Sequence, residues 1–254
     1  MAHNPLVISC EHAGNEVPPE WRSLFRGKDR LLASHRGWDP GALEAAQSFV
    51  RVMGVHQLHS NPTTRLLADP NRSEHNPAIW SEVTRGLPPE SKERILGEYW
   101  RPWRIEVQAA VEEEIERSGW VFHLSVHTFT PVLKGVRRTM DVGFLYDPRN
   151  RNDVEFCKSW RGVLHELEPS LTVRMNAPYR GVSDGVVSAF RKNFGQRRYL
   201  GVELEINQRF LKKSEKEWQR LRESLATSFQ QVYTDFNKNH KSPNTVVSPR
   251  AKVR

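Results

Sequence analysis

The sequence has 254 residues, of which 37% are hydrophobic and 27% charged, and its formal net charge is +8. This length is enough for one large domain with a substantial buried core, and the composition excludes a disordered chain. No run approaches the roughly 18 apolar residues of a membrane span, so no membrane partner is expected.

The start of the chain and the cysteines both favour the cytoplasm. The first residues, MAHNPLVISC, lack the basic segment and apolar core of a secretory signal. Cys10 and Cys157 are too few for a disulfide framework, so we expect two free thiols in a reducing compartment.

The positive charge raises nucleic acid as a class of partner, because basic surfaces attract phosphate through counterion release. Much of the excess lies in residues 238–254 and in short clusters such as Lys134–Arg138, and no nucleic-acid-binding motif organises it. We therefore expect no nucleic acid partner. Residues 238–254 lack large apolar side chains and are predicted to form a disordered basic tail. The net positive charge also suits an enzyme with a small anionic substrate.

Strands and helices are predicted to alternate in the first half of the chain. Pro5–Ser9 is an apolar run typical of a buried strand. A helix over Gly41–Met53 and a short second strand over Val55–Leu58 complete a βαβ opening. A long helical region is predicted over Pro88–Arg117, where apolar residues recur at helical spacing, and Gly119 ends it.

The second half continues the alternation. Predicted strands are Trp120–Val126, Asp141–Tyr146, Leu171–Met175 and Leu200–Ile206, and predicted helices are Asn152–Leu167 and Ser214–Phe236. Strands that alternate with helices indicate a mostly parallel sheet with helices on both faces. The sequence therefore predicts a single three-layer α/β domain over residues 1–237.

Polar side chains follow three of these strands, at the edge where parallel sheets bind ligands. Glu11 and His12 follow the first strand, His127 follows the third, and Glu203 and Glu205 lie near the end of the last. Each residue can also have a purely structural role. His12 can be a turn histidine and His127 a buried histidine, and Glu203 and Glu205 can pair with arginines. Together, two histidines and a glutamate are also the parts of a catalytic zinc site with its carboxylate base.

The segment SHRGWDPGA, residues 34–42, holds a further candidate ligand. Asp39 precedes Pro40 at the entrance to a predicted helix, where it could cap the helix or direct its carboxylate at the strand-end crevice. His35 is an alternate ligand, or a partner that orients one.

Seven segments in order along the chain resemble the N-formylglutamate amidohydrolase family. They are SCEHAGNEVP (9–18), SHRGWDPGA (34–42), TRLLADPNRS (64–73), VHTFTP (126–131), DVGFLYDP (141–148), NAPYRG with DG (176–181 and 184–185) and GVELEINQ (201–208). The resemblance covers about residues 6 to 210. It implies a phosphorylase/hydrolase-like fold shared with zinc carboxypeptidases and aspartoacylase-like enzymes, and hydrolysis of an N-acyl amino acid through one bound divalent metal.

The resemblance also implies roles for particular residues. His12 and His127 match the family's metal-side histidines, and Asp39 matches the acidic position of the second motif. Glu205 matches the glutamate of the late strand. The third metal ligand stays open between Asp39 and His35, with Asp39 preferred.

The predicted reaction is hydrolysis of the amide of an N-acyl acidic amino acid, or of a related small anionic amide, by a water that Zn²⁺ activates. Glu205 is predicted to accept the proton of this water. Arg65 is predicted to stabilise the oxyanion, because guanidinium donors suit such groups. The predicted substrate-binding residues lie in the motif loops and are Asn71, Arg72, Asn176, Tyr179 and Arg180.

The first motif departs from the family's pattern, since it reads Cys-Glu-His where that pattern has Pro-His-Ser-Gly. We therefore expect a sister branch that does not necessarily act on formylglutamate. Two other classes stay open: a non-catalytic anion-binding relative that keeps the arginines, and a basic nucleic-acid-binding protein. The roles of Glu11 and Glu203 and the oligomeric state stay open as well.

Overall fold

The computed structural model describes residues 4–239, so the predicted basic tail lies outside the described residues from residue 240 onwards. A six-stranded sheet runs through the molecule in the order β2-β1-β3-β8-β6-β7. Its strands are β1 (Leu6–Cys10), β2 (His59–Ser60), β3 (Val121–Phe129), β6 (Val142–Leu145), β7 (Val173–Met175) and β8 (Tyr199–Asn207). Four of them are parallel, and β6 and β7 run opposite to these four. The predicted single α/β domain with a mostly parallel sheet is confirmed.

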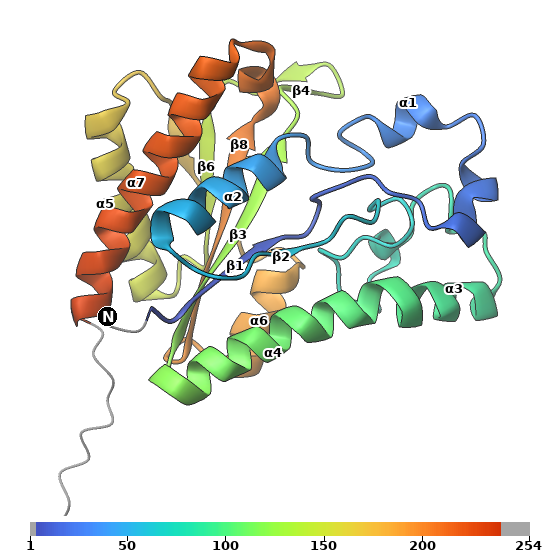
Figure 1. Ribbon diagram of the computed structural model, residues 1–254, viewed down its shortest axis with the longest axis horizontal. Coiled ribbons are helices and arrows are strands. Elements are labelled where there is room, and N and C mark those ends of the chain that lie inside the picture. The colour runs from blue at the N-terminus through green and yellow to red at the C-terminus, as the bar shows by residue number, and fades with distance from the viewer. Residues whose placement is uncertain (1–3, 240–254) are drawn as a thin grey trace, which may run out of the picture.

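Helices cover both faces of the sheet. The helix α2 (Ala42–Met53) packs with α5 (Arg151–Leu167) and α7 (Glu215–Asn239) over one face, where they bury the main apolar core (Figure 1). The helices α4 (Arg101–Ser118) and α6 (Val186–Phe194) bury a second core against the other face. These three layers place every residue of β3 and β8 in the interior.

The two faces of the central strands differ in polarity, because successive side chains of a strand point to opposite faces. The face toward α2, α5 and α7 is apolar, with residues such as Ile8, Leu124 and Leu204. The opposite face carries polar side chains in alternate positions: Ser9 and Glu11 on and just after β1, His123, Ser125 and His127 on β3, and Glu203 and Glu205 on β8. These polar residues are buried, so this face requires a functional explanation.

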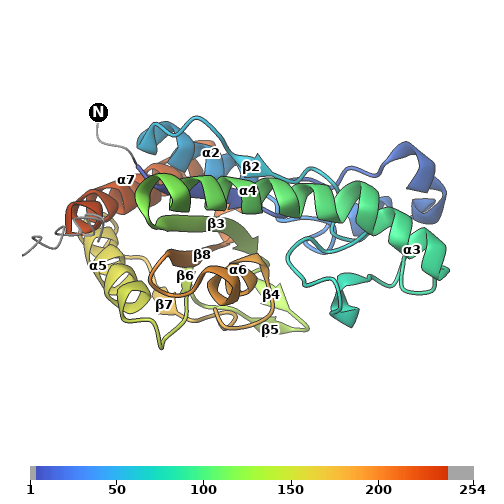
Figure 2. The same cartoon turned by 90° about the horizontal axis from the view of Figure 1, so that it is seen from below.

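A third apolar cluster holds the irregular segments beside the sheet. The short helices there are η1 (Pro19–Phe25), α1 (Asp29–Leu32), η2 (Pro77–Ile79) and α3 (Pro89–Ile95). They pack around Trp21, Leu67 and Ile95. Figure 2 shows α3 and α4 following one another along the molecule. Between them, η3 (Leu96–Trp100) is one π-helical segment, so the predicted long helix is confirmed with a local change of pitch.

Some predictions differ from the structure. The strand expected over Val55–Leu58 is wrong, because these residues lie half exposed at the sheet edge and pairing with β1 begins only at His59. The helix α6, the short hairpin of β4 (Val132–Leu133) with β5 (Val136–Arg137), and the 3-10 helix η4 (Gln208–Lys212) were not predicted.

Cys10 and Cys157 are both buried and unpaired, as expected. Within residues 4–239, the helices are all too short or too polar to cross a membrane.

Candidate metal centre and active site

Three predicted ligands meet beyond the polar face of the sheet. His12 follows β1, Asp39 precedes α2, and His127 is on β3. Each offers one ligand atom, and these atoms all lie within 4.8 Å of one another. The Asp39 Oδ2 atom lies 3.2 Å from His12 Nδ1 and 2.9 Å from His127 Nδ1. All three side chains are buried at the floor of a pocket that they help to line.

Asp39 is free to serve this cluster because it does not cap the helix. The N-cap position of α2 is Gly41, whose φ of 83° suits glycine, and no side chain caps this end. The capping role considered for Asp39 is therefore wrong. His35 lines the same pocket but does not belong to the group of converging ligand atoms.

The outer nitrogens of the two histidines are held by buried carboxylates. His12 Nε2 lies 2.8 Å from Asp69 Oδ1, and His127 Nε2 lies 3.1 Å from Glu11 Oε2. Asp39 Oδ2 accepts a proton from His127 Nδ1, and although burial lowers the pKa of His127, Glu11 and Asp39 hold it well above its usual value. A divalent metal can replace this proton: a proton on each Nε2 then donates to Asp69 or Glu11, and both Nδ1 atoms present lone pairs beside Asp39. This donor set therefore fits a divalent metal such as zinc.

Two buried hydroxyl groups hold the Glu11 carboxylate in place. It accepts hydrogen bonds from Ser9 Oγ at 2.8 Å and from Ser125 Oγ at 2.9 Å. Burial alone would raise the pKa of Glu11, but the charge and hydrogen bond of His127 and the Ser9 hydroxyl lower it to about 2. Glu11, whose role the sequence left open, therefore orients His127.

The hydrogen bonds continue behind Glu11. His123 Nε2 lies 2.7 Å from the Ser9 hydroxyl, and His123 Nδ1 lies 2.5 Å from the hydroxyl of Tyr199. Burial lowers the pKa of His123 to about 3, although the Glu11 charge opposes this shift. His123 is therefore a neutral imidazole that connects two hydroxyls.

Arg65 joins the two acidic residues of the centre. It donates to Asp69 Oδ2 at 2.7 Å, to Asp39 Oδ1 at 3.3 Å and to the Nδ1 atom of His12 at 3.2 Å. Burial would raise the pKa of Asp69, but the Arg65 charge and His12 hold it well below its usual value. Asp39 is likewise ionised, because His12, His127 and Arg65 outweigh its burial. Both carboxylates are thus ready to hold a cation and its ligands.

Two further carboxylates project from β8 into the same region. Glu205 pairs in register with His127 on the neighbouring strand, and its buried Oε2 atom has no hydrogen-bond partner. Burial raises the pKa of Glu205 to about 8, although the nearby charge of His127 opposes this. Burial also raises the pKa of Glu203. A group with these properties can exchange a proton near neutral pH.

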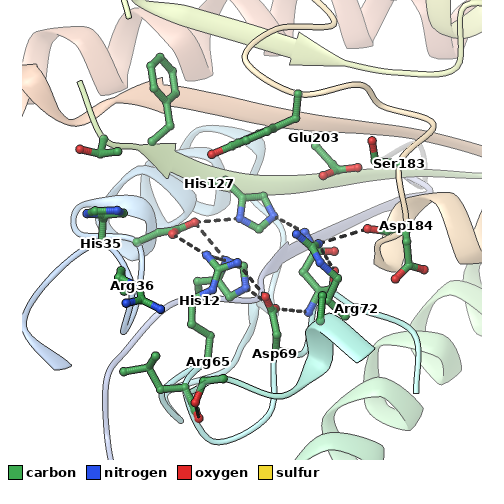
Figure 3. A pocket seen from close by; sticks show the side chains of 18 of the residues that line it. His12, His35, Arg36, Arg65, Asp69, Arg72, His127, Ser183, Asp184 and Glu203 are labelled. Carbon is green, nitrogen blue, oxygen red and sulfur yellow. Dashed lines mark hydrogen bonds and ion pairs between the residues drawn. The ribbon is translucent and has the colours of Figure 1, made fainter. Parts of the chain in front are cut away.

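A pocket of about 860 Å³ lies over this cluster. Figure 3 shows His12 and His127 at its centre, His35 and Arg36 on one side, and Ser183 and Asp184 on the other. The predicted site residues that line it are His12, His35, Asp39, Arg65, Asn71, Arg72, His127, Tyr179, Arg180 and Glu205. Asn176 does not line it; its side-chain oxygen accepts the backbone N–H groups of Tyr146 and Gly181 at 3.1 and 3.0 Å.

The sequence did not assign a role to Asp69 and left Glu11 open. Asp69 stands four residues after Arg65, a spacing that brings two such side chains together in one turn. For Glu11 the signal is the alternation of polar residues along β1, β3 and β8, which places them on one face. The spacing of Arg65 and Asp69 is visible in the sequence, whereas the role of Glu11 requires the register of the strands.

Comparison with known proteins gives one family and two solved structures of similar fold. The family model described as N-formylglutamate amidohydrolase matches residues 4–211. The crystal structure of a gene product from Agrobacterium tumefaciens has a TM-score of 0.73 and 25% identity, covering 94% of this chain and 92% of its own. That of N-formylglutamate amidohydrolase from Ralstonia eutropha has a TM-score of 0.71 and 20% identity, covering 93% and 95%.

A metallo-carboxypeptidase from Burkholderia cenocepacia has a TM-score of 0.40 and 12% identity, covering 94% of this chain and 58% of its own. The expected relation to zinc carboxypeptidases therefore stays a prediction. None of the curated proteins matches the sequence.

Proposed function

The chain belongs to the N-formylglutamate amidohydrolase family, and on this basis we propose that its pocket hydrolyses the amide of an N-acyl acidic amino acid or of a related small anionic amide. In this proposal His12, Asp39 and His127 hold one zinc ion. The observation that carries it is the convergence of two Nδ1 lone pairs and one carboxylate oxygen, each backed by a buried partner.

The metal supplies the electrophilic part of the chemistry. A bound zinc ion polarises a carbonyl oxygen and lowers the pKa of water toward about 7. Asp69 and Glu11 keep the outer nitrogens of the histidines protonated, so that the ligand atoms stay available. Arg65 keeps Asp39 and Asp69 in place through its hydrogen bonds with both.

Glu205 is the proposed general base. Its carboxylate lies in the pocket, on the strand position paired with His127, and its free Oε2 atom can accept the proton of the attacking water. The same oxygen then passes the proton to the leaving nitrogen. Burial raises the pKa of Glu205 to about 8, which favours the acid form that returns the proton, and a cation held by His12, Asp39 and His127 would lower this pKa and favour the carboxylate that accepts it.

The arginines take the negative charges of the reaction. Arg65 uses part of its five N–H donors on the centre, and those left face the developing oxyanion. Arg72 and Arg180 line the pocket, and in the described part of the chain neither forms an ion pair with a carboxylate. They are the proposed binding groups for substrate carboxylates.

The remaining candidates have narrower roles. Asn71 accepts the Val186 N–H at 2.8 Å through its side-chain oxygen, so it positions the start of α6 beside the pocket. The Tyr179 hydroxyl accepts a hydrogen bond from Arg138 at 3.2 Å and can donate to a substrate. The cytoplasmic location and the absence of nucleic acid and membrane partners are not required by this proposal and stay predictions.

Turnover of N-acylated amino acids tests the proposal. Purified protein loaded with zinc is offered the N-formyl, N-acetyl and N-succinyl derivatives of glutamate and aspartate, and release of the amine is measured. We expect hydrolysis of at least one of them. Glu205→Gln should abolish turnover while zinc remains bound, because the amide cannot accept the proton. Wild-type rates in this variant would contradict the assignment of the base.

The non-catalytic anion-binding relative remains the second candidate. It would bind the same compounds through Arg72 and Arg180 without cleaving them. Binding without product release, unchanged by added zinc, would favour it over the enzyme.

A further inference from the structure

Glu203 is a buried carboxylate that nothing in the proposed reaction uses. It is 8% exposed and lines the pocket, on the same face of β8 as Glu205. Within residues 4–239 it forms no hydrogen bond and no ion pair. An ionised group in such a place is costly unless a partner arrives from outside the protein. Glu203 therefore points to a ligand group that donates hydrogen bonds or carries positive charge.

An opposite charge faces the same part of the pocket. Figure 3 shows Glu203 and Arg72 on the side of His127 where Ser183 and Asp184 lie. Burial raises the pKa of Glu203, and the charges that oppose this shift include that of Arg72. Within residues 4–239, a carboxylate and a guanidinium thus line the same end of the pocket without an ion pair between them.

The Arg72 guanidinium is held in place by its own loop. The Nη1 atom of Arg72 donates to the backbone carbonyls of Asn71 at 2.6 Å and Asp184 at 3.2 Å. Its loop is tied further by Ser73, which donates to Asp184 through its hydroxyl at 2.6 Å and its N–H at 3.0 Å. The backbone of Glu203 belongs to the central strand β8. Both charges are therefore carried by fixed backbone, which suits a preorganised binding site.

We propose that Glu203 and Arg72 form a subsite for an amino acid head, in which Glu203 receives the α-ammonium group and Arg72 the α-carboxylate. This inference rests on the proposed amidase function, but it replaces the Nα-acyl acidic substrate of that proposal with an amino acid that carries the amide on its side chain. The amide that is cleaved then lies on the side chain of the amino acid, because its α-amino group must be free.

This substrate class differs from an Nα-acyl amino acid. In an Nα-acyl compound the α-nitrogen is part of the amide and carries no charge, so Glu203 would be left buried without a partner. Sites built to bind a polar group reject analogues that lack it by large factors, because their own polar groups lose their partners. We therefore expect the protein to prefer side-chain amides by at least about 100-fold in kcat/KM.

Matched isomers test the subsite. The zinc-loaded protein is offered the Nω-acetyl and the Nα-acetyl forms of L-2,3-diaminopropionate, L-2,4-diaminobutyrate, L-ornithine and L-lysine, together with γ-L-glutamyl amides. At least one side-chain amide should be cleaved faster than its Nα counterpart. In Glu203→Gln its KM should rise by about 10- to 100-fold, while cleavage of the Nα isomers is unchanged. Preference for the Nα isomers, or an equal loss with both, would overturn the subsite.

Glu82→Gln is the matched control. Glu82 also lines the pocket, but Arg36 pairs with it at 2.6 Å, so its loss should not change the choice between isomers. Zinc content and thermal melting of each variant show whether it has folded.

A binding measurement separates the subsite from the amidase function. If no compound is cleaved, the proposed function fails, and calorimetry then measures binding of the Nω-acetyl amino acids themselves. Binding to the wild type that weakens about 10-fold or more in Glu203→Gln supports the subsite. No binding, or equal binding to both proteins, overturns it.

Discussion

The Asp39 carboxylate shows how one residue depends on several others. Its Oδ2 atom faces two imidazole nitrogens, while its Oδ1 atom is held by Arg65. A carboxylate between two imidazoles is stable only if the protons or a cation are placed correctly. At the residue scale, the site is therefore defined by the groups behind its ligands, and Glu11 is the one that can be tested most cleanly.

Replacement of Glu11 by glutamine should weaken zinc binding. The amide can donate a hydrogen bond to His127 Nε2, which moves the imidazole proton to Nδ1 and removes a ligand lone pair. We expect an affinity about 10- to 100-fold lower, measured by competition with a chromophoric chelator. Glu168→Gln removes another buried carboxylate, far along the chain in a pair with Arg220, and should leave the affinity unchanged. Wild-type affinity in Glu11→Gln would contradict the role of Glu11.

His123 should make the folded state sensitive to acid. Its pKa is lowered to about 3 by burial in the folded protein, against about 6.5 in the unfolded chain. The stability it contributes is complete above pH 6.5 and is lost as the pH falls toward 3, because only the unfolded chain then binds the proton. Between pH 7 and 5 the free energy of unfolding should fall by about 2 kcal/mol more in the wild type than in His123→Asn. Denaturant titrations with chelator present measure this difference, and equal losses would contradict it.

At the scale of the elements, close backbone contacts fix the loop that carries Tyr179 and Arg180. A Cβ atom at Gly143 on β6 would lie 1.9 Å from the Ala177 carbonyl oxygen, so only glycine fits there. Gly143→Ala should lower the free energy of unfolding by about 1 to 3 kcal/mol and displace this loop. Gly162→Ala, in α5, meets no atom within 4 Å and should raise it by up to about 1 kcal/mol. The melting temperatures of the two variants are compared with that of the wild type. Equal stability of Gly143→Ala and Gly162→Ala would contradict the proposed close contact at Gly143.

The elements that the sequence predicted are those with strong apolar patterns. The strands β3 and β8 carry apolar residues at every second position over most of their length, and α4 and α7 repeat apolar residues at helical spacing, so their positions could be predicted. The edge strand β2 and the helix α6 could not. β2 pairs over two residues only, and α6 is short and held by the contact of its Val186 N–H with Asn71. Such elements depend on tertiary contacts that no local pattern contains.

The candidate ligands show the same division. His12 and His127 could be singled out because strand ends of an α/β fold meet at one edge, whereas the preference for Asp39 over His35 came from the resemblance to the family. The role of Asp69 required knowledge of how the loop over residues 64–73 folds back on the sheet. The difference between Asn176 and its neighbours required the turn in which it lies, where its side chain binds backbone N–H groups.

At the scale of the whole molecule, the sheet has one apolar face and one polar face, and the pocket lies over the polar one. The apolar face packs against α2, α5 and α7 and provides most of the core. The side chains of the polar face form hydrogen bonds with one another, which hold the candidate ligands in place. Because these positions are polar, this face buries less apolar surface than the other. The buried polar face therefore serves the pocket, and the proposed metal lies at its centre.

Metal content is the measurement that tests this claim most directly. Protein prepared without chelator is analysed for bound metal, with His127→Ala as the variant that loses a ligand and His35→Ala as a control that lines the pocket outside the ligand group. We expect about one zinc ion per chain in the wild type and in His35→Ala, and a large loss in His127→Ala. Absence of metal from the wild type, with none taken up from added zinc, would contradict the account.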